Sequence, residues 1–224
     1  MSGFSVIITA GGVGKRMGGP IPKQFLEIAG KPILMHTLEK FHVFDPASQL
    51  VLTIPSSWKS YWEELLEKHS CHIPHLIVEG GKERYHSIKN ALAVCSGDHV
   101  AVHDGVRPLV SAATIEACFN GAKEFGAAIP VIPLKESIRR INDTSSVAED
   151  RLLFRLVQTP QCFRKDVLLE AYSLPYHDRI TDDASLVEEC GYEVHLALGN
   201  EENIKITSSI DLSIAEMLLR PEKE

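Results

Sequence analysis

The sequence lacks the cysteine and histidine spacings that most metal and redox sites require. Its five cysteines lie more than twenty residues apart, so there is no C-x-x-C pair, and its ten histidines form no H-E-x-x-H motif. Zinc sites, thiol redox motifs and a disulfide framework are therefore excluded as interpretations, and no protein-held metal is predicted. An odd, scattered set of cysteines is typical of reduced, buried thiols, so we expect a cytoplasmic protein.

Long apolar runs and an excess of basic charge are also missing. No apolar stretch approaches the ~18 residues of a membrane span, and the first residues carry no basic region before an apolar core, so we expect neither a span nor a signal peptide. Lys and Arg number 23 against 30 Asp and Glu, which gives a net charge of −7. This excludes a broad basic face for nucleic acid. A phosphorylated ligand would need a local positive pocket.

The sequence does contain an alternation of apolar, β-branched runs with helical patterns. The expected strands are Ser5–Ala10, Leu50–Ile54, His75–Val78, His99–His103, Ala127–Ile132, Arg155–Gln158 and Glu193–Leu198. The expected helices are Pro32–Phe41, Trp58–His69, Glu83–Cys95, Thr114–Phe125, Lys165–Leu174, Ala184–Cys190 and Ile210–Leu219, with start signals at Ser57, Ser111, Asp182 and Ser209. The alternation predicts an α/β fold, a doubly wound, mostly parallel sheet in one domain, 1–224. Ligands bind such sheets beyond the carboxyl ends of the strands.

The segment 134–153 interrupts this alternation. It is polar and carries the turn cluster NDTSS, residues 142–146, between two short half-polar runs. This pattern predicts a projecting hairpin, a β-arm inserted in the domain. A surface loop is the alternative; the arm interpretation implies that it packs on a partner subunit, so a homodimer is expected.

A glycine-rich loop, TAGGVGKRMGGPIPKQF, follows the first expected strand at residues 9–25. It is not a P-loop, because Gly14 and Lys15 are followed by Arg16 rather than Ser or Thr, and it is not a dinucleotide fingerprint, because Met17 replaces the third glycine. Its glycines allow backbone N–H groups to face an anion, and Lys15, Arg16 and Lys23 add three cations. This set suits a triphosphate that is attacked at its α-phosphorus.

The loop is similar to the nucleotide loop of the 2-C-methyl-D-erythritol 4-phosphate cytidylyltransferases. The resemblance continues in order through GGKERYHS (80–87), HDGVRP (103–108), TPQ (159–161), TDDAS (181–185) and NIKIT (203–207). It implies a Rossmann-like nucleotidyltransferase that joins CTP to methylerythritol 4-phosphate in non-mevalonate isoprenoid synthesis and releases pyrophosphate. One departure is that Gly105 and Val106 replace two alanines of the commoner HDAARP form. HDxVRP also resembles the ribitol 5-phosphate cytidylyltransferases.

The resemblance assigns roles to individual residues. Arg16 and Lys23 stabilise the transition state, while Arg151, on the arm, and Lys205 position the substrate. The nucleotide-binding residues are Ala10, Gly11, Gly12, Gly14, Lys15, Gly80, Gly81, Arg84, Ser87, Asp104 and Gly105. The substrate-binding residues are Arg107, Ser137, Thr181 and Thr207, where Arg107 either pairs with the substrate phosphate or anchors its loop. The resemblance also implies that Arg151 reaches the site of a neighbouring subunit, so that activity would require the dimer.

The sequence shows no Ser-His-Asp or Cys-His arrangement, and the reaction requires none. The acceptor phosphate monoester has a second pKa of ~6 and is already anionic at neutral pH. It can attack the α-phosphorus once the repulsion between the two anions is screened. No carboxylate cluster forms an evident cage, so Mg²⁺ is expected to be held mainly by the CTP phosphates and water.

Three alternatives remain open at this point. The first is a ribitol 5-phosphate cytidylyltransferase, the second a nucleotide-binding regulator without turnover, and the third a sugar-phosphate nucleotidyltransferase that uses UTP or GTP. The catalytic interpretation makes one geometric prediction. Seven cations should converge at one edge of the sheet: Lys15, Arg16, Lys23, Arg84, Arg107, Arg151 and Lys205.

Overall fold

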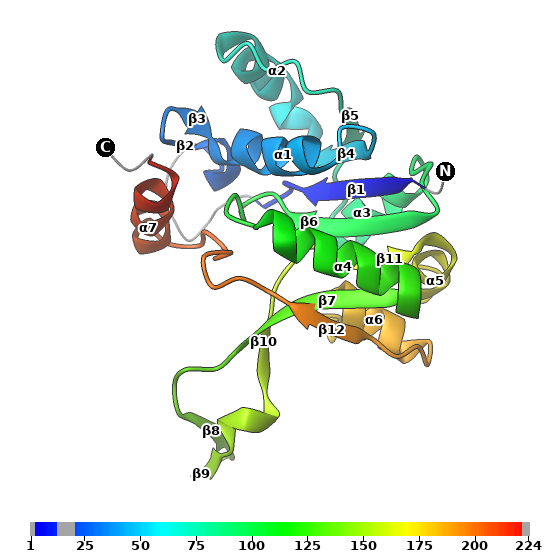
Figure 1. Cartoon of the computed structure of the whole chain (residues 1–224), viewed down its shortest axis with the longest axis vertical. Helices are drawn as coiled ribbons and strands as arrows, with labels where there is room; N and C mark the ends of the chain where they lie inside the picture. Colours follow the sequence, from blue (N-terminus) through cyan, green and yellow to red (C-terminus); the bar gives the residue numbers. More distant parts are fainter. Residues whose placement is uncertain (1–2, 13–20, 221–224) are drawn as a thin grey trace.

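One eight-stranded sheet forms the centre of the computed structural model, which describes residues 3–12 and 21–220 (Figure 1). The strands follow the order β10-β7-β11-β6-β1-β4-β5, and β12 also pairs with β7. Their bounds are β1 (Phe4–Thr9), β4 (Gln49–Ile54), β5 (Leu76–Glu79), β6 (His99–Asp104), β7 (Ala127–Pro133), β10 (Arg155–Val157), β11 (Gln161–Arg164) and β12 (His195–Leu198). β1 pairs in parallel with β4 and β6, β4 with β5, and β7 with β12. The predicted, mostly parallel sheet is confirmed.

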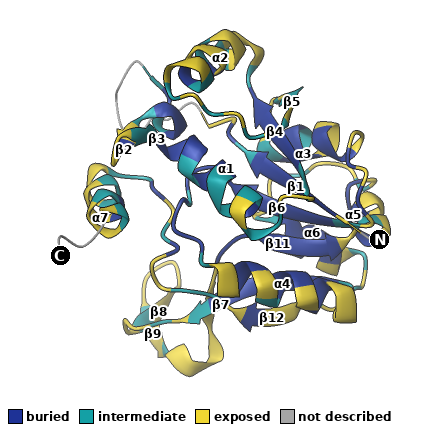
Figure 2. Cartoon of the chain, turned by 45° about the horizontal axis from the view of Figure 1, so that its top comes forward, coloured by how far each residue is buried: buried dark blue, intermediate teal, exposed yellow. Residues whose placement is uncertain are grey.

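Helices cover both faces of the sheet, because successive side chains of a strand point to opposite sides. In β1, Val6 and Ile8 belong to one hydrophobic core and Ile7 to a second. The first core takes side chains from α1 (Ile33–Phe44), α2 (Lys59–Lys68) and α4 (Ala112–Phe125). The second takes them from α3 (Arg84–Leu92), α5 (Lys165–Ala171) and α6 (Asp183–Glu189). Figure 2 shows the strands buried between these helices, so the fold is doubly wound as predicted.

A third, smaller core lies beside the sheet. It packs α7 (Ser209–Leu219) against the short hairpin of β2 (Glu27–Ile28) and β3 (Lys31–Pro32) (Figure 1). Val106 and Ile206 belong to this core, and the Ile206 N–H donates to the Val106 carbonyl at 3.0 Å. The small core therefore fixes the two chain segments that carry Arg107 and Lys205.

The expected strands and helices are all present, with ends shifted by a few residues, but three features differ from the predictions. Neither β11 nor the short β2–β3 hairpin was predicted; β11 lies antiparallel between β6 and β7. Two of the four helix start signals are also wrong. Ser57 lies within a 3-10 turn and does not cap α2, and the residue that caps α7 is Ser208, whose extended backbone precedes the helix, rather than Ser209. Ser111 and Asp182 cap α4 and α6 as predicted.

The segment 134–153 contains the hairpin that its turn cluster predicts. β8 (Ile138–Ile141) pairs antiparallel with β9 (Ser146–Glu149), and the Asn142 N–H donates to the Ser145 carbonyl at 2.9 Å. Figure 1 shows this arm projecting from the body, and Figure 2 shows that most of it is exposed. Its exposed apolar residues include Ile141, Leu152 and Leu153. No helix within residues 3–12 and 21–220 is long and apolar enough to span a membrane.

Candidate active site

A cavity of about 350 Å³ lies at the carboxyl ends of β1 and β6, where a parallel sheet is expected to bind its ligand. Five chain segments line it, and most of them carry a motif singled out in the sequence. The lining residues are Thr9, Ala10, Gly11, Gly12, Lys23, Gln24, Gly81, Lys82, Glu83, Arg84, Ser87, Asp104, Val106 and Lys205. The motifs, far apart in the chain, therefore meet at one place.

The two described ends of the glycine-rich loop are tied together beside this cavity. The buried Gln24 side chain donates from Nε2 to the Ala10 carbonyl at 2.6 Å. The neighbouring Lys23 donates from Nζ to the Ile206 carbonyl at 2.8 Å, which brings this cation next to the segment of Lys205. The predicted residues Gly14, Lys15 and Arg16 lie outside the described residues.

Gly81 and Ser87 form a second wall of the cavity. Ser87 Oγ accepts a hydrogen bond from the Gly81 N–H at 3.0 Å and donates to the Glu83 carbonyl at 3.2 Å. A Cβ on Gly81 would lie 2.3 Å from the Cβ of His86, so a larger residue would displace the turn. The turn between β5 and α3 is therefore held tightly, with backbone and hydroxyl groups near the cavity.

The Asp104 carboxylate, at the end of β6, gathers three cations. Its oxygens lie 3.1 Å from Arg107 Nε, 3.1 Å from Lys205 Nζ and 3.9 Å from Arg84 Nε. Burial raises the pKa of Asp104, but these cations outweigh burial and hold that pKa well below its usual value. The carboxylate is therefore ionised at neutral pH and offsets the mutual repulsion of the cations.

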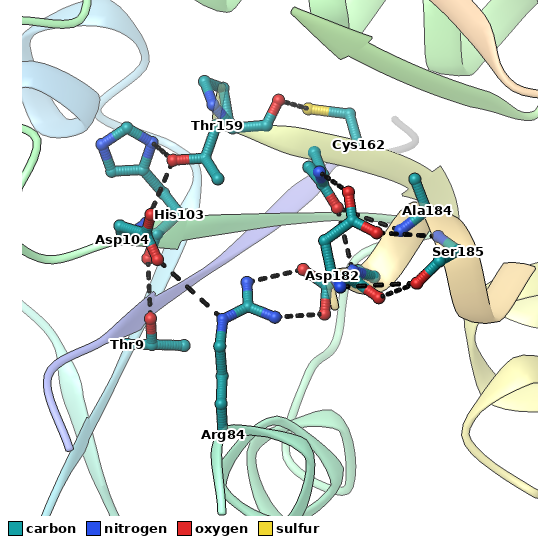
Figure 3. Close-up of polar contacts among 12 residues, drawn as sticks. Thr9, Arg84, His103, Asp104, Thr159, Cys162, Asp182, Ala184 and Ser185 are labelled. Carbon is teal, nitrogen blue, oxygen red and sulfur yellow. Dashed lines mark hydrogen bonds and ion pairs between the residues drawn. The ribbon is translucent and has the colours of Figure 1, made fainter. Parts of the chain in front are cut away.

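Arg84 is held in place by a second carboxylate. Its two terminal nitrogens donate to the two oxygens of Asp183 at 2.9 and 2.6 Å, a forked pair (Figure 3). Asp183 is fully buried and also accepts from the Tyr172 hydroxyl at 2.5 Å. Gln161 fixes the start of α6, because its Oε1 accepts from the N–H groups of Asp183 and Ala184, both at 3.0 Å. The guanidinium of Arg84 is thus preorganised between Asp104 and Asp183.

A second cavity, of about 320 Å³, adjoins the first. Arg84, Asp104 and Lys205 line both cavities. The remaining lining residues of the second cavity are Arg107, Val157, Gln158, Thr159, Gln161, Thr181 and Asp182. The two cavities therefore share one charged wall, whose cations belong to both.

Arg107 has the contacts of a loop anchor. Besides Asp104, its guanidinium donates from Nη1 to the Asn203 carbonyl at 2.7 Å, and the side chain is only 12% exposed. Of the two roles considered for Arg107, these contacts match the anchor.

Other predicted residues do not line either cavity. Gly80 and Gly105 lie behind the walls; a Cβ on Gly105 would lie 2.9 Å from the Thr9 carbonyl oxygen. The Thr207 hydroxyl donates to Asp211 at 2.9 Å, near the start of α7. Ser137 and Arg151 lie on the arm, where Arg151 Nη1 donates to the Lys135 carbonyl.

Several residues that line the cavities, or that hold a lining side chain in place, were not among the predicted site residues. Asp183, Gln24 and Thr159 have no separate signal of their own, although each lies within or directly beside a motif that was quoted. Gln158, Gln161, Asp182, Lys82, Glu83 and Val106 also line a cavity without having been proposed as site residues. The only sequence feature that could have pointed to these residues is their position in or next to the motifs.

Replacing Asp104 by Asn should lower the free energy of unfolding by about 2 kcal/mol at pH 7, because it leaves Arg107 and Lys205 without their carboxylate. The folded-state pKa of Asp104 lies below its unfolded value of ~3.9. The stabilisation is thus fully present above the unfolded pKa and is lost as the pH falls towards the folded pKa.

Urea unfolding of the wild type and Asp104→Asn at pH 7, 5 and 3.5 measures this difference. We expect similar differences at pH 7 and 5 and a smaller one at pH 3.5. A difference that grows as the pH falls would contradict the assignment of Asp104 as the ionised centre of the cluster.

Comparison with known proteins identifies the family. The family model described as 2-C-methyl-D-erythritol 4-phosphate cytidylyltransferase matches residues 4–221. Curated proteins of that name include one from Phocaeicola vulgatus, 49% identical over 215 residues that cover 96% of this chain and 98% of that one. Another, from Bacteroides thetaiotaomicron, is 47% identical over 216 residues, 96% of this chain and 99% of that one.

Solved structures agree with this result. A crystal structure of 2-C-methyl-D-erythritol 4-phosphate cytidylyltransferase from Thermus thermophilus has a TM-score of 0.77 and 31% identity, covering 96% of this chain and 97% of that one. A 4-diphosphocytidyl-2C-methyl-D-erythritol synthase from Anaerococcus prevotii has a TM-score of 0.85 and 27% identity, covering 98% and 99%. The chain belongs to the 2-C-methyl-D-erythritol 4-phosphate cytidylyltransferase family.

Proposed function

We propose that this protein transfers a cytidylyl group from CTP to 2-C-methyl-D-erythritol 4-phosphate, giving CDP-methylerythritol and pyrophosphate. Membership of the family supports the reaction and both substrates. The structural observation that carries the proposal is the wall of Arg84, Asp104 and Lys205 that the two cavities share. A nucleotide in the first cavity and an acceptor phosphate in the second would meet at the same cations.

The proposed step is a direct in-line displacement. An oxygen of the acceptor phosphate forms a bond to the α-phosphorus of CTP, and the bond from that phosphorus to the oxygen bridging to the β-phosphate breaks. Pyrophosphate leaves with the electron pair. Because the acceptor is already an anion at neutral pH, no general base is required. This fits a site whose prominent polar feature is a set of cations.

The cations have two tasks in this step. They screen the repulsion between the acceptor phosphate and CTP, and they stabilise the charge that develops on the equatorial oxygens and the departing pyrophosphate. Lys23 and Lys205 line the first cavity, and we assign both tasks to them. We assign Arg16 and Lys15, by resemblance, to the outgoing phosphates. Gly81 and Ser87 supply the backbone and hydroxyl groups that would contact the base.

A divalent ion would enter on the nucleotide. Within the described ranges, no group of three or more His, Cys, Asp or Glu side chains could hold a metal by itself. Glu83 and Asp104 are carboxylates of the first cavity. Two carboxylates are too few for a protein cage, which fits Mg²⁺ carried mainly by the CTP phosphates and water. The ion would supply further neutralisation of the phosphate charge.

We also propose that the chain acts as a homodimer through the arm. Arg151 and Ser137 lie on the arm and line neither cavity of their own chain. Exposed apolar side chains include Leu152 and Leu153 of the arm and Leu198 of β12, which pairs with Val131 of β7 close to the start of the arm. Exposed apolar residues of this kind suit an isologous contact with a second copy. The partner subunit's Arg151 would then complete the acceptor site.

We further propose a single domain over 1–224 that works in the cytoplasm. The five cysteines are free thiols in the structure, in keeping with that compartment.

Pyrophosphate release tests the reaction directly. With CTP and Mg²⁺, we expect turnover with methylerythritol 4-phosphate and far less with ribitol 5-phosphate, and we expect UTP and GTP to replace CTP poorly. Preference for ribitol 5-phosphate would assign the protein to the sister activity, and no release with any pair would leave a nucleotide-binding protein without turnover.

Lys23→Ala should lower kcat of this pyrophosphate release by about 10²–10³-fold, since it removes a donor that acts mainly on the transition state.

Complementation between two inactive variants tests the role of the arm. Arg151→Ala and Lys205→Ala should each lose most activity when expressed alone. When they are co-expressed, a dimer of one copy of each contains one intact site if the arm reaches across. Random pairing makes half of the dimers mixed, so about a quarter of the wild-type activity should return. If Arg151 served its own chain, no activity would return.

A further inference from the structure

Four polar residues at the second cavity form a closed ring of hydrogen bonds; two of them, Arg107 and Thr159, line that cavity. The imidazole Nε2 of His103 contacts the Arg107 carbonyl at 3.1 Å, and Arg107 Nη1 donates to the Asn203 carbonyl at 2.7 Å. Asn203 Nδ2 donates to the Thr159 carbonyl at 2.8 Å. The Thr159 hydroxyl contacts His103 Nδ1 at 3.0 Å, as Figure 3 shows. The ring joins the end of β6 to the turn before β11 and to the segment that leads to Lys205.

The contacts fix the protonation state of the His103 ring. The Arg107 carbonyl can only accept, so Nε2 of His103 must carry a proton. The Thr159 Oγ1 already accepts from the Asp104 N–H at 3.2 Å, which leaves its own proton free to be donated to Nδ1 of His103. Burial lowers the pKa of His103 to about 4, so the ring is neutral at pH 7. Every polar atom of the imidazole is thereby satisfied in a fully buried place.

The ring acts on the charged wall at two points. Through Thr159, it holds the backbone N–H of Asp104. Through the Arg107 carbonyl, it holds the residue whose Nε contacts the Asp104 carboxylate at 3.1 Å. Lys205 contacts the same carboxylate. His103 itself lines neither cavity, so any effect it has on a ligand must pass through these neighbours.

Packing alone does not call for a histidine at this position. His103 has no exposed surface, and its ring packs against the Phe41 ring in a T-shaped arrangement with the centroids 4.8 Å apart. An aliphatic residue of similar size would fill the same buried volume without the cost of burying two polar nitrogens. The imidazole is matched instead to its donor and acceptor partners.

We propose that His103 is a positioning residue of the transfer reaction, which sets the place of the Asp104 carboxylate and, with it, of Lys205. The inference rests on the proposed function for its effect on turnover. It goes beyond that function in assigning a task to a buried neutral imidazole that touches no substrate. The orientation of the charged wall then depends on a specific tautomer, with the proton on Nε2.

Kinetics of His103→Leu provide the first test. The variant keeps a buried apolar side chain and removes both hydrogen bonds, so kcat/KM for methylerythritol 4-phosphate should fall on the order of 10- to 100-fold, as expected for a small displacement of positioning groups. Thr159→Val removes the hydroxyl and should resemble His103→Leu, whereas Thr159→Ser keeps the hydroxyl and should retain more of the wild-type kcat/KM than Thr159→Val. Because both act through one ring, the double variant should lose little more than either single variant.

Gly97→Ala supplies the matched control for destabilisation. Gly97 lies just before the amino end of β6, away from both cavities, and a Cβ there would be 2.4 Å from the Gly3 carbonyl oxygen. It should lower stability with normal kinetics at a temperature where all variants are folded. If His103→Leu showed the same normal kinetics, or if its loss simply added to that of Thr159→Val, the positioning role would be overturned.

Nitrogen NMR tests the ring without using turnover. With ¹⁵N-labelled histidine, the His103 resonances, identified by their loss in His103→Leu, should show the Nε2–H tautomer at pH 7, and the Nδ1 shift should change in Thr159→Val. The Asp104 carboxyl should titrate at a higher pH in His103→Leu than in the wild type. A protonated ring, the Nδ1–H tautomer, or an unmoved Asp104 titration would overturn the inference. A wild type that releases no pyrophosphate but passes these NMR tests would instead count against the proposed function alone.

Discussion

The structure around the site depends on one buried carboxylate. Asp104 stands at the end of a central strand and holds Arg84, Arg107 and Lys205 within 4 Å of its oxygens. Three cations brought together at a sheet edge would repel one another, and a carboxylate among them offsets that repulsion. Burying the carboxylate costs desolvation free energy, and its attraction to the three cations compensates for that cost. The arrangement leaves Arg84 and Lys205 at the surface of both cavities, while Arg107 is used to anchor the loop.

This arrangement explains how a protein of net charge −7 can bind highly charged anions. The positive charge is local, and it is concentrated where two cavities meet rather than spread over a face. Of the seven cations expected to converge, Lys23, Arg84, Arg107 and Lys205 do so. Arg151 lies on the arm, outside both cavities, which is why the proposed dimer matters. The other two, Lys15 and Arg16, lie outside the described residues.

Local patterns in the sequence were enough for the main elements of the fold. Strand and helix periodicity predicted the doubly wound sheet, and the turn cluster at 142–146 predicted the hairpin of the arm. β11 was missed because only the two central residues of Gln161–Arg164, Cys162 and Phe163, are apolar. Its place between β6 and β7 is set by pairing with strands distant in sequence. The capping serines were misplaced where a helix is preceded by a 3-10 turn or by two serines in a row.

The motifs predicted which residues belong to the site, but they did not predict the contacts that these residues make. Strand ends and quoted motifs led to Lys23, Arg84, Asp104 and Lys205. The partners that orient these residues were not predictable, because Asp183 and Arg84 are 99 positions apart and meet only in the folded chain. The hydrogen-bond ring behind Asp104 has the same character, since its four members come from three distant segments.

A crystal structure with CTP and inorganic phosphate bound together would test the central claim, that one charged wall serves two anions, most directly. We predict the nucleotide in the 350 Å³ cavity beside Ser87 and Lys23, and the free phosphate in the 320 Å³ cavity. Lys205 should lie within hydrogen-bond distance of phosphate oxygens from both ligands. A nucleotide bound elsewhere, or a phosphate that makes no contact with the wall of Arg84, Asp104 and Lys205, would contradict the account.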